Sequence, residues 1–370
     1  LRGPGRSNAL RLPDQLSHGP AALSASFDEP NLPVSAGLVP AVRLAQRVGL
    51  HDLSEEHVTT GANPGSKVMC LVAAMAAGAD SIDDMDMLRR AGAGTVFSGV
   101  RAPSTLGTFL RGFTFGHVRQ LEAVAARTLI RLAQVAPLLP GIEPTCLIEI
   151  DDTVKPVFGP GKQGAQFGYT KVCGLNTQLA TFSTSESAPV IAATRLRRGA
   201  AASSHGAVRM LRDAIVTARR CGAGQNILVR ADSAYCSSAI LQAISKAGAR
   251  FRIGIPLNRR VRAATAGIDD ADWVRIEYPW AIPDPQTGEL ISAAEIAEMP
   301  FTAFASKPAS KQVSARLIVR RIPERNQTKL QDPLFPAFRY HALFTDNPAS
   351  LVAAESTHRG HARGHPSPRP

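Results

Sequence analysis

The sequence has no long hydrophobic run and no paired cysteines. The longest apolar stretch, from Val68 to Ala79, is too short and too rich in alanine to span a bilayer. The N-terminal residues are interrupted by arginine and proline and show no secretory signal. The five cysteines are scattered, odd in number and without a C-x-x-C pair, which excludes a disulfide framework and a zinc finger. We therefore expect a soluble cytoplasmic protein with reduced thiols and no membrane partner.

Acidic residues are outnumbered by basic ones. The chain has 30 Asp and Glu against 42 Lys and Arg, which gives a net charge of +12 and a pI near 10.0. Arginine contributes most of the positive charge, and its planar guanidinium binds phosphate through two parallel hydrogen bonds. This balance favours a polyanionic partner, with nucleic acid as the first choice. The alternative is a GC-rich genome, which raises the arginine and alanine content without any such partner.

Two apolar stretches end in acidic residues. The first runs from Thr145 to Val154 and includes Glu149, Asp151 and Asp152 in a pattern typical of a half-buried strand. The second is a short apolar run, 227–229, that leads to Asp232. Two strands that each deliver a carboxylate to their ends can form a site for Mg²⁺, which prefers oxygen ligands. The alternative for a single strand-end aspartate is that it only caps a turn.

Changes in composition and in hydrophobic periodicity divide the chain into segments. We expect a disordered lead (1–27), a helical DNA-binding domain (28–136), an α/β catalytic core (145–256), a β-rich insertion (257–339), a return to the core (340–362) and an aberrant tail (363–370). Within the helical domain, helical spacing or capping residues predict several helices. They are expected at 37–57, 67–77, 81–90 and 117–135, with another that starts near Pro103.

The core segment alternates between strand and helix patterns. We expect strands at 145–154, 169–182, 190–196, 227–231 and 250–256, with helices at 205–220 and 237–247. Three strands, helix, strand, helix, strand is the order of the ribonuclease-H-like fold, a mixed sheet with acids at the ends of neighbouring central strands. The predicted fold class is therefore α/β, with a ribonuclease-H-like sheet and an all-helical domain before it.

Several motifs together resemble the DDE transposases of bacterial insertion sequences, specifically the family numbered thirteen-eighty. The matching segments, in order, are 28–31 with 37–40, 78–86, 99–107, 162–165 with 168–171, and 230–233. They extend from about residue 28 to 362 and so cover nearly the whole chain. The resemblance implies a nucleoid-associated enzyme that binds terminal inverted repeats and target DNA as a homodimer, then cleaves and joins strands.

The resemblance also assigns the acids. In such a family three acids hold two Mg²⁺ ions, with Mn²⁺ as a substitute, that activate water or a 3′-hydroxyl for attack on phosphorus. The first acid falls on Asp151, two residues before Thr153, and the second on Asp232. Strand alternation agrees, because Asp152 lies on the face of Ile148 and Ile150, opposite to Asp151. Asp152 remains the less favoured alternative.

The third acid is missing from its expected place. The resemblance puts it at position 365, on a helix that begins near Ser356, but the sequence has His365 followed by prolines that cannot continue a helix. Glu355 and Asp346 are two weaker substitutes. We therefore expect a truncated or frameshifted copy that lacks cleavage activity. The alternatives are a non-catalytic DNA-binding remnant that represses transposition and a ribonuclease-H-like nuclease.

Clusters of basic residues in the core and the insertion are candidate phosphate contacts. The alternative for each of them is a solvated basic rim without a partner. The residues we expect to contact DNA are Lys162, Lys171, Arg195, Arg197, Arg198, Arg259 and Arg260. Lys162 and Lys171 are favoured, because they lie in the family-like segment that follows the first acidic strand.

Overall fold

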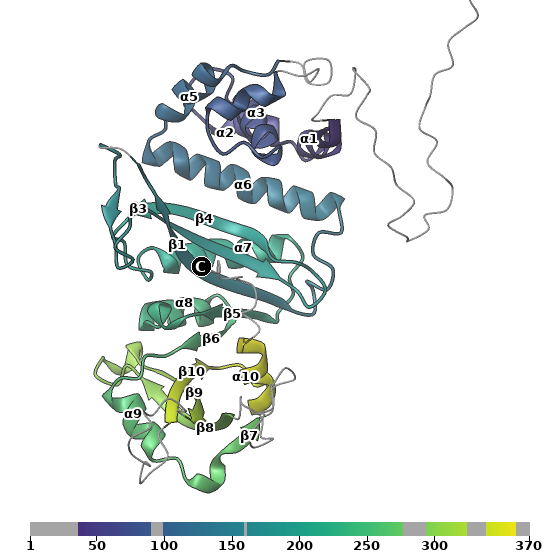
Figure 1. Ribbon diagram of the computed structural model, residues 1–370. Helices are drawn as coiled ribbons and strands as arrows, with labels where there is room; N and C mark the ends of the chain where they lie inside the picture. The colour runs from purple at the N-terminus through teal and green to yellow at the C-terminus, as the bar shows by residue number, and fades with distance from the viewer. Residues whose placement is uncertain (1–35, 90–98, 159–160, 277–293, 324–337, 360–370) are drawn as a thin grey trace, which may run out of the picture.

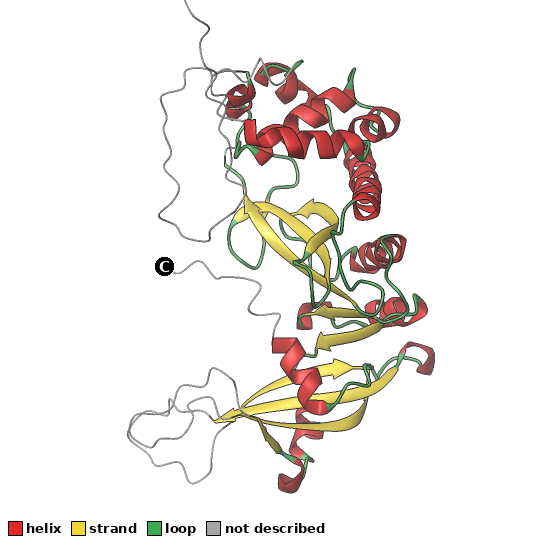
Figure 2. Ribbon diagram, turned by 90° about the vertical axis from the view of Figure 1, so that its right-hand side faces the viewer, coloured by secondary structure: helices red, strands yellow, loops and turns green. Residues whose placement is uncertain are grey.

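The structure of the protein, a computed structural model, describes residues 36–89, 99–158, 161–276, 294–323 and 338–359. The chain is mixed α/β with one large mixed sheet, which confirms the expected fold class at that level (Figure 1). The turned view of Figure 2 shows the N-terminal helices at the top and the strands below them. In the part of the chain that the structure describes, no helix is long and apolar enough to cross a membrane.

The described residues from Ala36 to Val135 form helices and no strand. The α-helices are α1 (Val39–Arg47), α2 (Leu50–His57), α3 (Pro64–Ala76), α5 (Pro103–Arg111) and α6 (Phe115–Val135). They pack around two small apolar clusters, one built on Leu53 and Phe109 and the other on Leu88 and Leu106. The long helix α6 contacts α2 on one side and the sheet on the other (Figure 1).

One predicted helix in this region is shorter and tighter than expected. Between Ser81 and Arg90 the structure describes only a 3₁₀ helix, Asp83–Leu88. The Asp84 carboxylate accepts hydrogen bonds from the Ser81 amide (3.1 Å) and hydroxyl (2.6 Å). Side-chain hydrogen bonds of this local kind compete with a regular α-helical start.

The strands of the described residues form a single 10-stranded sheet, in the order β2-β3-β1-β5-β6-β10-β9-β8-β7, with β4 also paired to β3. The strands are β1 (Cys146–Pro156), β2 (Gln166–Phe167), β3 (Cys173–Ser183), β4 (Val190–Arg198), β5 (Ile227–Ala231), β6 (Arg250–Gly254), β7 (Val274–Ile276), β8 (Ala294–Ala303), β9 (Val313–Pro323) and β10 (Phe338–Thr345).

The central strands carry the main core on one face. β1 is antiparallel to β3 and parallel to β5, which is in turn parallel to β6. Alternate residues of β1, including Ile148 and Ile150, are buried and belong to the same apolar cluster as helices α7 (Ala207–Arg220) and α8 (Ser238–Lys246). Burial of this shared apolar surface is the main stabilising contribution. The residues between them in β1, such as Asp151, lie on the opposite face.

The segment expected to be a β-rich insertion continues this same sheet. β10 pairs antiparallel with β6, and β9, β8 and β7 follow outward from it. A helix that the sequence did not indicate, α9 (Arg259–Ala266), comes between β6 and β7, and Asn258 caps it by accepting from the amides of residues 260 and 261.

The last described helix, α10 (Leu351–Arg359), begins before the predicted start near Ser356. The reason lies in two polar residues ahead of it. Asn347 accepts a hydrogen bond from the Ala349 amide (2.8 Å), and the Ser350 hydroxyl accepts one from the Ala353 amide (3.4 Å). Such capping satisfies the free amides of a first turn and fixes where the helix starts.

Candidate metal site and nucleic-acid interface

Asp232 directly follows β5, and Asp151 lies within the neighbouring parallel strand β1, at the residue after its last pair with β5. Ile150 of β1 pairs with Ala231 of β5, and each aspartate is the residue that follows. The two acids therefore lie side by side, on the face opposite to the buried Ile150 and Ala231. The structure thus brings together the two acids that the sequence singled out.

The charges of the two acids act on each other. The pKa of Asp232 is raised, first by partial burial and then by the neighbouring negative charges of Asp151 and Asp152. Asp232 is oriented by a hydrogen bond from the Ala234 amide (3.0 Å), and Asp151 by one from the Asp152 amide (2.8 Å). Two oriented carboxylates that repel each other are suited to share a cation.

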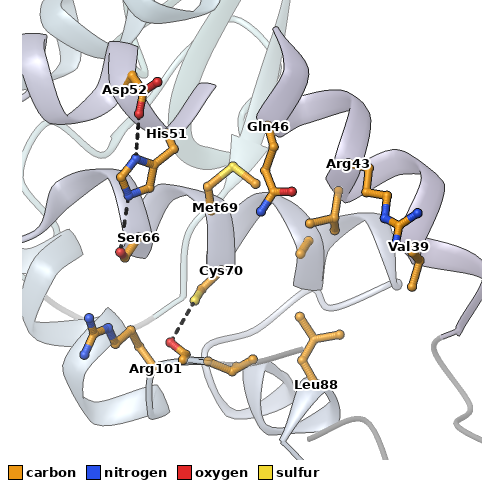
Figure 3. A pocket seen from close by; sticks show the side chains of 14 residues that line it. Val39, Arg43, Gln46, His51, Asp52, Ser66, Met69, Cys70, Leu88 and Arg101 are labelled. Atoms are coloured by element: carbon orange, nitrogen blue, oxygen red, sulfur yellow. Dashed lines mark hydrogen bonds and ion pairs between the residues drawn. The ribbon is translucent and has the colours of Figure 1, made fainter. Parts of the chain in front are cut away.

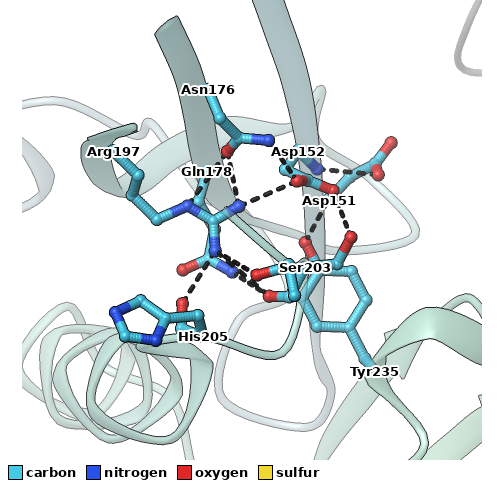
Figure 4. Close-up of polar contacts among 9 residues, drawn as sticks. Asp151, Asp152, Asn176, Gln178, Arg197, Ser203, His205 and Tyr235 are labelled. Carbon is cyan, nitrogen blue, oxygen red and sulfur yellow. Dashed lines mark hydrogen bonds and ion pairs between the residues drawn. The ribbon is translucent and has the colours of Figure 1, made fainter. Parts of the chain in front are cut away.

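Asp152 has a structural role on the other face of the strand. Its carboxylate lies 2.8 Å from the Arg197 guanidinium and accepts hydrogen bonds from Asn176 (2.5 Å), Ser203 (2.9 Å) and Tyr235 (3.3 Å), as Figure 4 shows. The side chains of Asp152 and Arg197 are only 9% and 4% exposed. This network holds Asp152 in the interior, whereas Asp151 is exposed on the opposite face of β1.

Neither substitute for the third acid reaches the site. β10 runs antiparallel to β6, so Asp346 lies beside the start of β6, where it accepts from the Phe251 amide (2.7 Å), at the edge away from Asp232. Glu355 is buried against β9 and pairs with Arg320 at 3.1 Å. Position 365 lies outside the described residues.

The donor set fits one divalent ion. Within the described ranges, no group of three or more His, Cys, Asp or Glu side chains is arranged to hold a metal. Two neighbouring carboxylates suit Mg²⁺, which keeps several of its positions for water and phosphate oxygen. A second ion would require a further ligand beyond these two.

Arg230 connects the acidic strands to α10, a role that the sequence analysis missed. Its guanidinium pairs with Glu149 of β1 and donates to the carbonyl of Thr357 in the last turn of α10. The end of α10 therefore lies over β5, on the same face as Asp151. The sequence contains a signal for this role. Arg230 is a charged residue within a buried run, and it precedes Asp232 by two residues, as Glu149 precedes Asp151.

Of the predicted phosphate contacts, two are engaged inside the protein. Arg197 is committed to Asp152 and also donates to the carbonyls of Ala202 (3.0 Å) and His205 (2.7 Å). Arg195, 12% exposed, lies 3.9 Å from Glu122 and 3.7 Å from Asp213. Both arginines therefore have partners within the protein, and their contact with DNA stays a prediction.

The remaining predicted contacts are exposed. Lys162 and Lys171 lie in the connection between β1 and β3, and Arg198 ends β4. Arg259 and Arg260 begin α9, which follows the carboxyl end of β6. Because β6 is parallel to β5, these two arginines lie toward the same edge of the sheet as Asp232. An exposed cation at that edge can contact a phosphate without losing an internal partner.

A cavity of about 640 Å³ lies among the N-terminal helices, away from the acidic site (Figure 3). His51 lies 3.0 Å from Asp52 and 3.5 Å from the Ser66 hydroxyl. The order Asp-His-Ser resembles the arrangement that activates a serine nucleophile. However, the Asp52 side chain is 86% exposed and the serine contact is at the limit of a hydrogen bond. Water screens this arrangement, so it does not activate the serine.

Comparison with known proteins identifies the family. The sequence matches the family described as "Transposase DDE domain group 1" over residues 21–331. No curated protein matches. A solved structure described as a piggyBac transposase synaptic complex with hairpin DNA is similar in fold, with a TM-score of 0.41 and 10% identity. That match covers 88% of this chain and 66% of the other. The family match extends over most of the sequence and includes both Asp151 and Asp232, so the chain belongs to the DDE transposase domain family.

Proposed function

We propose that the protein binds DNA as a transposase of a bacterial insertion sequence and presents Asp151 and Asp232 to a divalent metal ion at the target phosphate. The observation that carries the proposal is the position of these acids, each directly after a paired residue of neighbouring parallel strands. Family membership supports the transposase activity, and the strand order β4-β3-β1-β5-β6 is consistent with a ribonuclease-H-like core.

The carboxylates of Asp151 and Asp232 would hold the ion, Mg²⁺ or Mn²⁺. When bound, the ion supplies positive charge that favours in-line attack of water or a 3′-hydroxyl on phosphorus. The chain's own contribution is orientation: the amides of residues 152 and 234 fix the two carboxylates. Arg197 keeps Asp152 on the opposite face, so the site presents two acids and not three.

Double-stranded DNA is the proposed partner, as terminal inverted repeats and as target, bound by a homodimer at the nucleoid. Support comes from the net charge of +12 and from five exposed basic residues, Lys162, Lys171, Arg198, Arg259 and Arg260. The sequence resemblance to the family numbered thirteen-eighty supports the assignment to inverted repeats.

We further propose that this polypeptide binds DNA without cleaving it. The position that corresponds to the third acid is His365, and Asp346 and Glu355 are engaged away from the site. With two carboxylates the site favours one metal ion, whereas two-ion catalysis must stabilise both the attacking and the leaving oxygen. A non-catalytic repressor that occupies element ends is therefore the second candidate function.

The test combines metal binding, DNA binding and cleavage. Calorimetric titration of the wild type with Mn²⁺ is expected to show one binding site. Asp151→Asn and Asp232→Asn should each abolish this binding, whereas Asp52→Asn, at an exposed position, is the control and should leave it intact. Gel shifts are expected to show binding to an inverted repeat by the wild type and by all three variants, with no nicking.

Three outcomes would contradict parts of this proposal. Metal binding unchanged in both site variants would refute the assignment of the acids. Nicking that depends on Asp151 and Asp232 would refute the proposed inactivity. Preferential cleavage of RNA–DNA hybrids, with no preference for an element end, would indicate a ribonuclease-H-like nuclease.

A further inference from the structure

Three aromatic side chains at the tip of β1, β2 and β3 are almost fully exposed. Phe158 is 88% exposed, Phe167 70% and Tyr169 89%. Among the large apolar side chains that the structure describes, only one other, Phe115 at 73%, reaches this level. An isolated exposed ring is ordinary, but three together mark an interaction surface. We call these three residues the aromatic tip.

Strand pairing brings together the chain segments that carry the three rings. Phe167 of β2 pairs with Cys173 of β3, and the carbonyl of Cys173 accepts a hydrogen bond from the Val157 amide (3.1 Å) next to Phe158. The Lys171 amide donates to the Gly168 carbonyl (3.0 Å) and closes a turn around Tyr169. The rings thus come from chain segments that are adjacent at one corner of the sheet.

Phe167 of the aromatic tip shares a sheet face with the acidic site. Lys155 pairs with Leu175, and Phe167 pairs with Cys173, two residues away on the same strand. Lys155, Phe167 and Asp151 therefore project to one face, because residues separated by an even number along a strand point to the same side. Asp151 and Lys155 are roughly 13 Å apart along β1. A nucleic-acid strand bound at Asp151 can reach the tip within a few nucleotides.

The charge around the tip is uniformly positive. Between Thr153 and Ser185 the sequence contains three lysines and no Asp, Glu, Arg or His. All three lysines, Lys155, Lys162 and Lys171, are exposed. Aromatic rings interleaved with lysines match a strand with exposed bases and a phosphate backbone. An apolar protein partner or a second copy of the chain would not require a surface that carries lysines and no acidic residues.

The tip is held firmly by close backbone contacts. A side chain at Gly199, at the end of β4, would lie 2.1 Å from the Gly174 carbonyl oxygen and 2.3 Å from that of Gln166. The Gly199 amide donates to the Gly164 carbonyl (3.0 Å). The segments carrying the rings are therefore packed backbone to backbone against β4. Such preorganisation lowers the entropy lost when a ligand stacks on the rings.

We propose that the aromatic tip is a stacking platform for unpaired DNA bases beside the Asp151–Asp232 site. This inference rests on the proposed function, since it presupposes DNA bound along that face. Bases within an intact duplex are already stacked on their neighbours and cannot offer their faces to the rings. The platform therefore selects DNA that is frayed, mismatched or single-stranded near the phosphate that the acids address.

The test compares two DNA duplexes of equal length, one fully paired and one with a few mismatched central bases that include a fluorescent adenine analogue. The wild type is expected to bind the mismatched duplex more tightly and to quench the analogue. Phe158→Ala/Phe167→Ala/Tyr169→Ala should lose about tenfold in affinity for the mismatched duplex, remove the quenching and retain affinity for the paired duplex. Phe115→Ala, equally exposed on α6, is the matched control and should behave as the wild type.

The same three positions changed to leucine distinguish stacking from general apolar contact. We expect the leucine variant to lose quenching as the alanine variant does. The platform proposal would be overturned if either variant still quenched the analogue and still preferred the mismatched duplex. It would also be overturned if the variants lost equal affinity for both duplexes. A variant-specific change in oligomeric state by light scattering would show instead that the tip joins two copies. A wild type that binds neither duplex would refute the proposed DNA-binding function itself, whereas equal binding without quenching refutes only the platform.

Discussion

The Arg197 guanidinium lies 2.8 Å from the Asp152 carboxylate, and this buried ion pair separates the roles of two adjacent aspartates. Asp152 belongs to the interior network of Figure 4, and Asp151 is exposed on the opposite face of β1. Burial lowers the pKa of Arg197, while the charge of Asp152 acts in the opposite direction. The pair therefore persists because each charge compensates for the desolvation of the other.

Replacement of Asp152 is expected to destabilise the fold without removing the metal site. Asp152→Asn leaves the Arg197 charge buried without its counter-charge, which costs about 3 to 5 kcal/mol when one partner of such a pair is lost. Asp151→Asn should change the free energy of unfolding by less than about 0.5 kcal/mol and abolish Mn²⁺ binding. Urea unfolding and calorimetry measure the two effects. The reverse pattern would mean that Asp152 is the metal-binding acid.

Asp232 is expected to lower stability at neutral pH in the absence of metal. Its pKa is raised by burial and by Asp151 and Asp152, so the ionised carboxylate is less favourable in the folded state than in the unfolded one. Asp232→Asn removes this charge and keeps an acceptor for the Ala234 amide, so the unfolding midpoint at neutral pH should rise slightly. The difference should shrink as the pH falls through the raised pKa, because the wild-type carboxyl then gains its proton in the folded state. Thermal unfolding of both proteins across that pH range measures it, and a lower midpoint for the variant at pH 7 would contradict the assignment.

The acidic strands were predictable because their information is local. Alternation along 145–154 places Ile148 and Ile150 on one face and Asp151 on the other, and the structure has this arrangement. The run that ends at Ala231 is likewise a strand with the predicted bounds. For the same reason the start of α10 could have been found, since Ser350 is a capping residue immediately before Leu351.

Other features depended on partners far away in the chain. The sequence marks Arg197 only as a candidate DNA contact, because its partner Asp152 is 45 residues away and only tertiary pairing reveals it. The pairing of β10 with β6 joins segments separated by the whole predicted insertion. Local patterns indicate that such strands exist, yet they do not state which edge of a sheet the strands extend.

Removal of Arg230 is expected to detach the end of α10. The guanidinium is 7% exposed on its side chain, pairs with Glu149 and donates to the Thr357 carbonyl. Arg230→Gln should cost about 3 kcal/mol or more in unfolding free energy, because it breaks a largely buried ion pair with Glu149. Hydrogen exchange should accelerate in 351–359 but not in β1 or β5. Arg198→Gln, at an exposed position, is the control, and uniform acceleration throughout the sheet would argue against a specific link to α10.

Exposed and buried arginines are expected to differ in their effect on the salt dependence of DNA binding. Each phosphate contact releases counterions, so its loss lowers the slope of log affinity against log salt by about one unit. Arg259→Gln/Arg260→Gln should reduce the slope by about two because both side chains are exposed toward the edge that carries Asp232. Arg209→Gln, on α7 at the other face of the sheet, should leave the slope unchanged although its side chain is 71% exposed. Fluorescence anisotropy at several salt concentrations measures the slopes. An equal reduction for Arg209 would show that the positive charge acts through the overall field of the protein, and DNA would then have no defined path past Asp151 and Asp232.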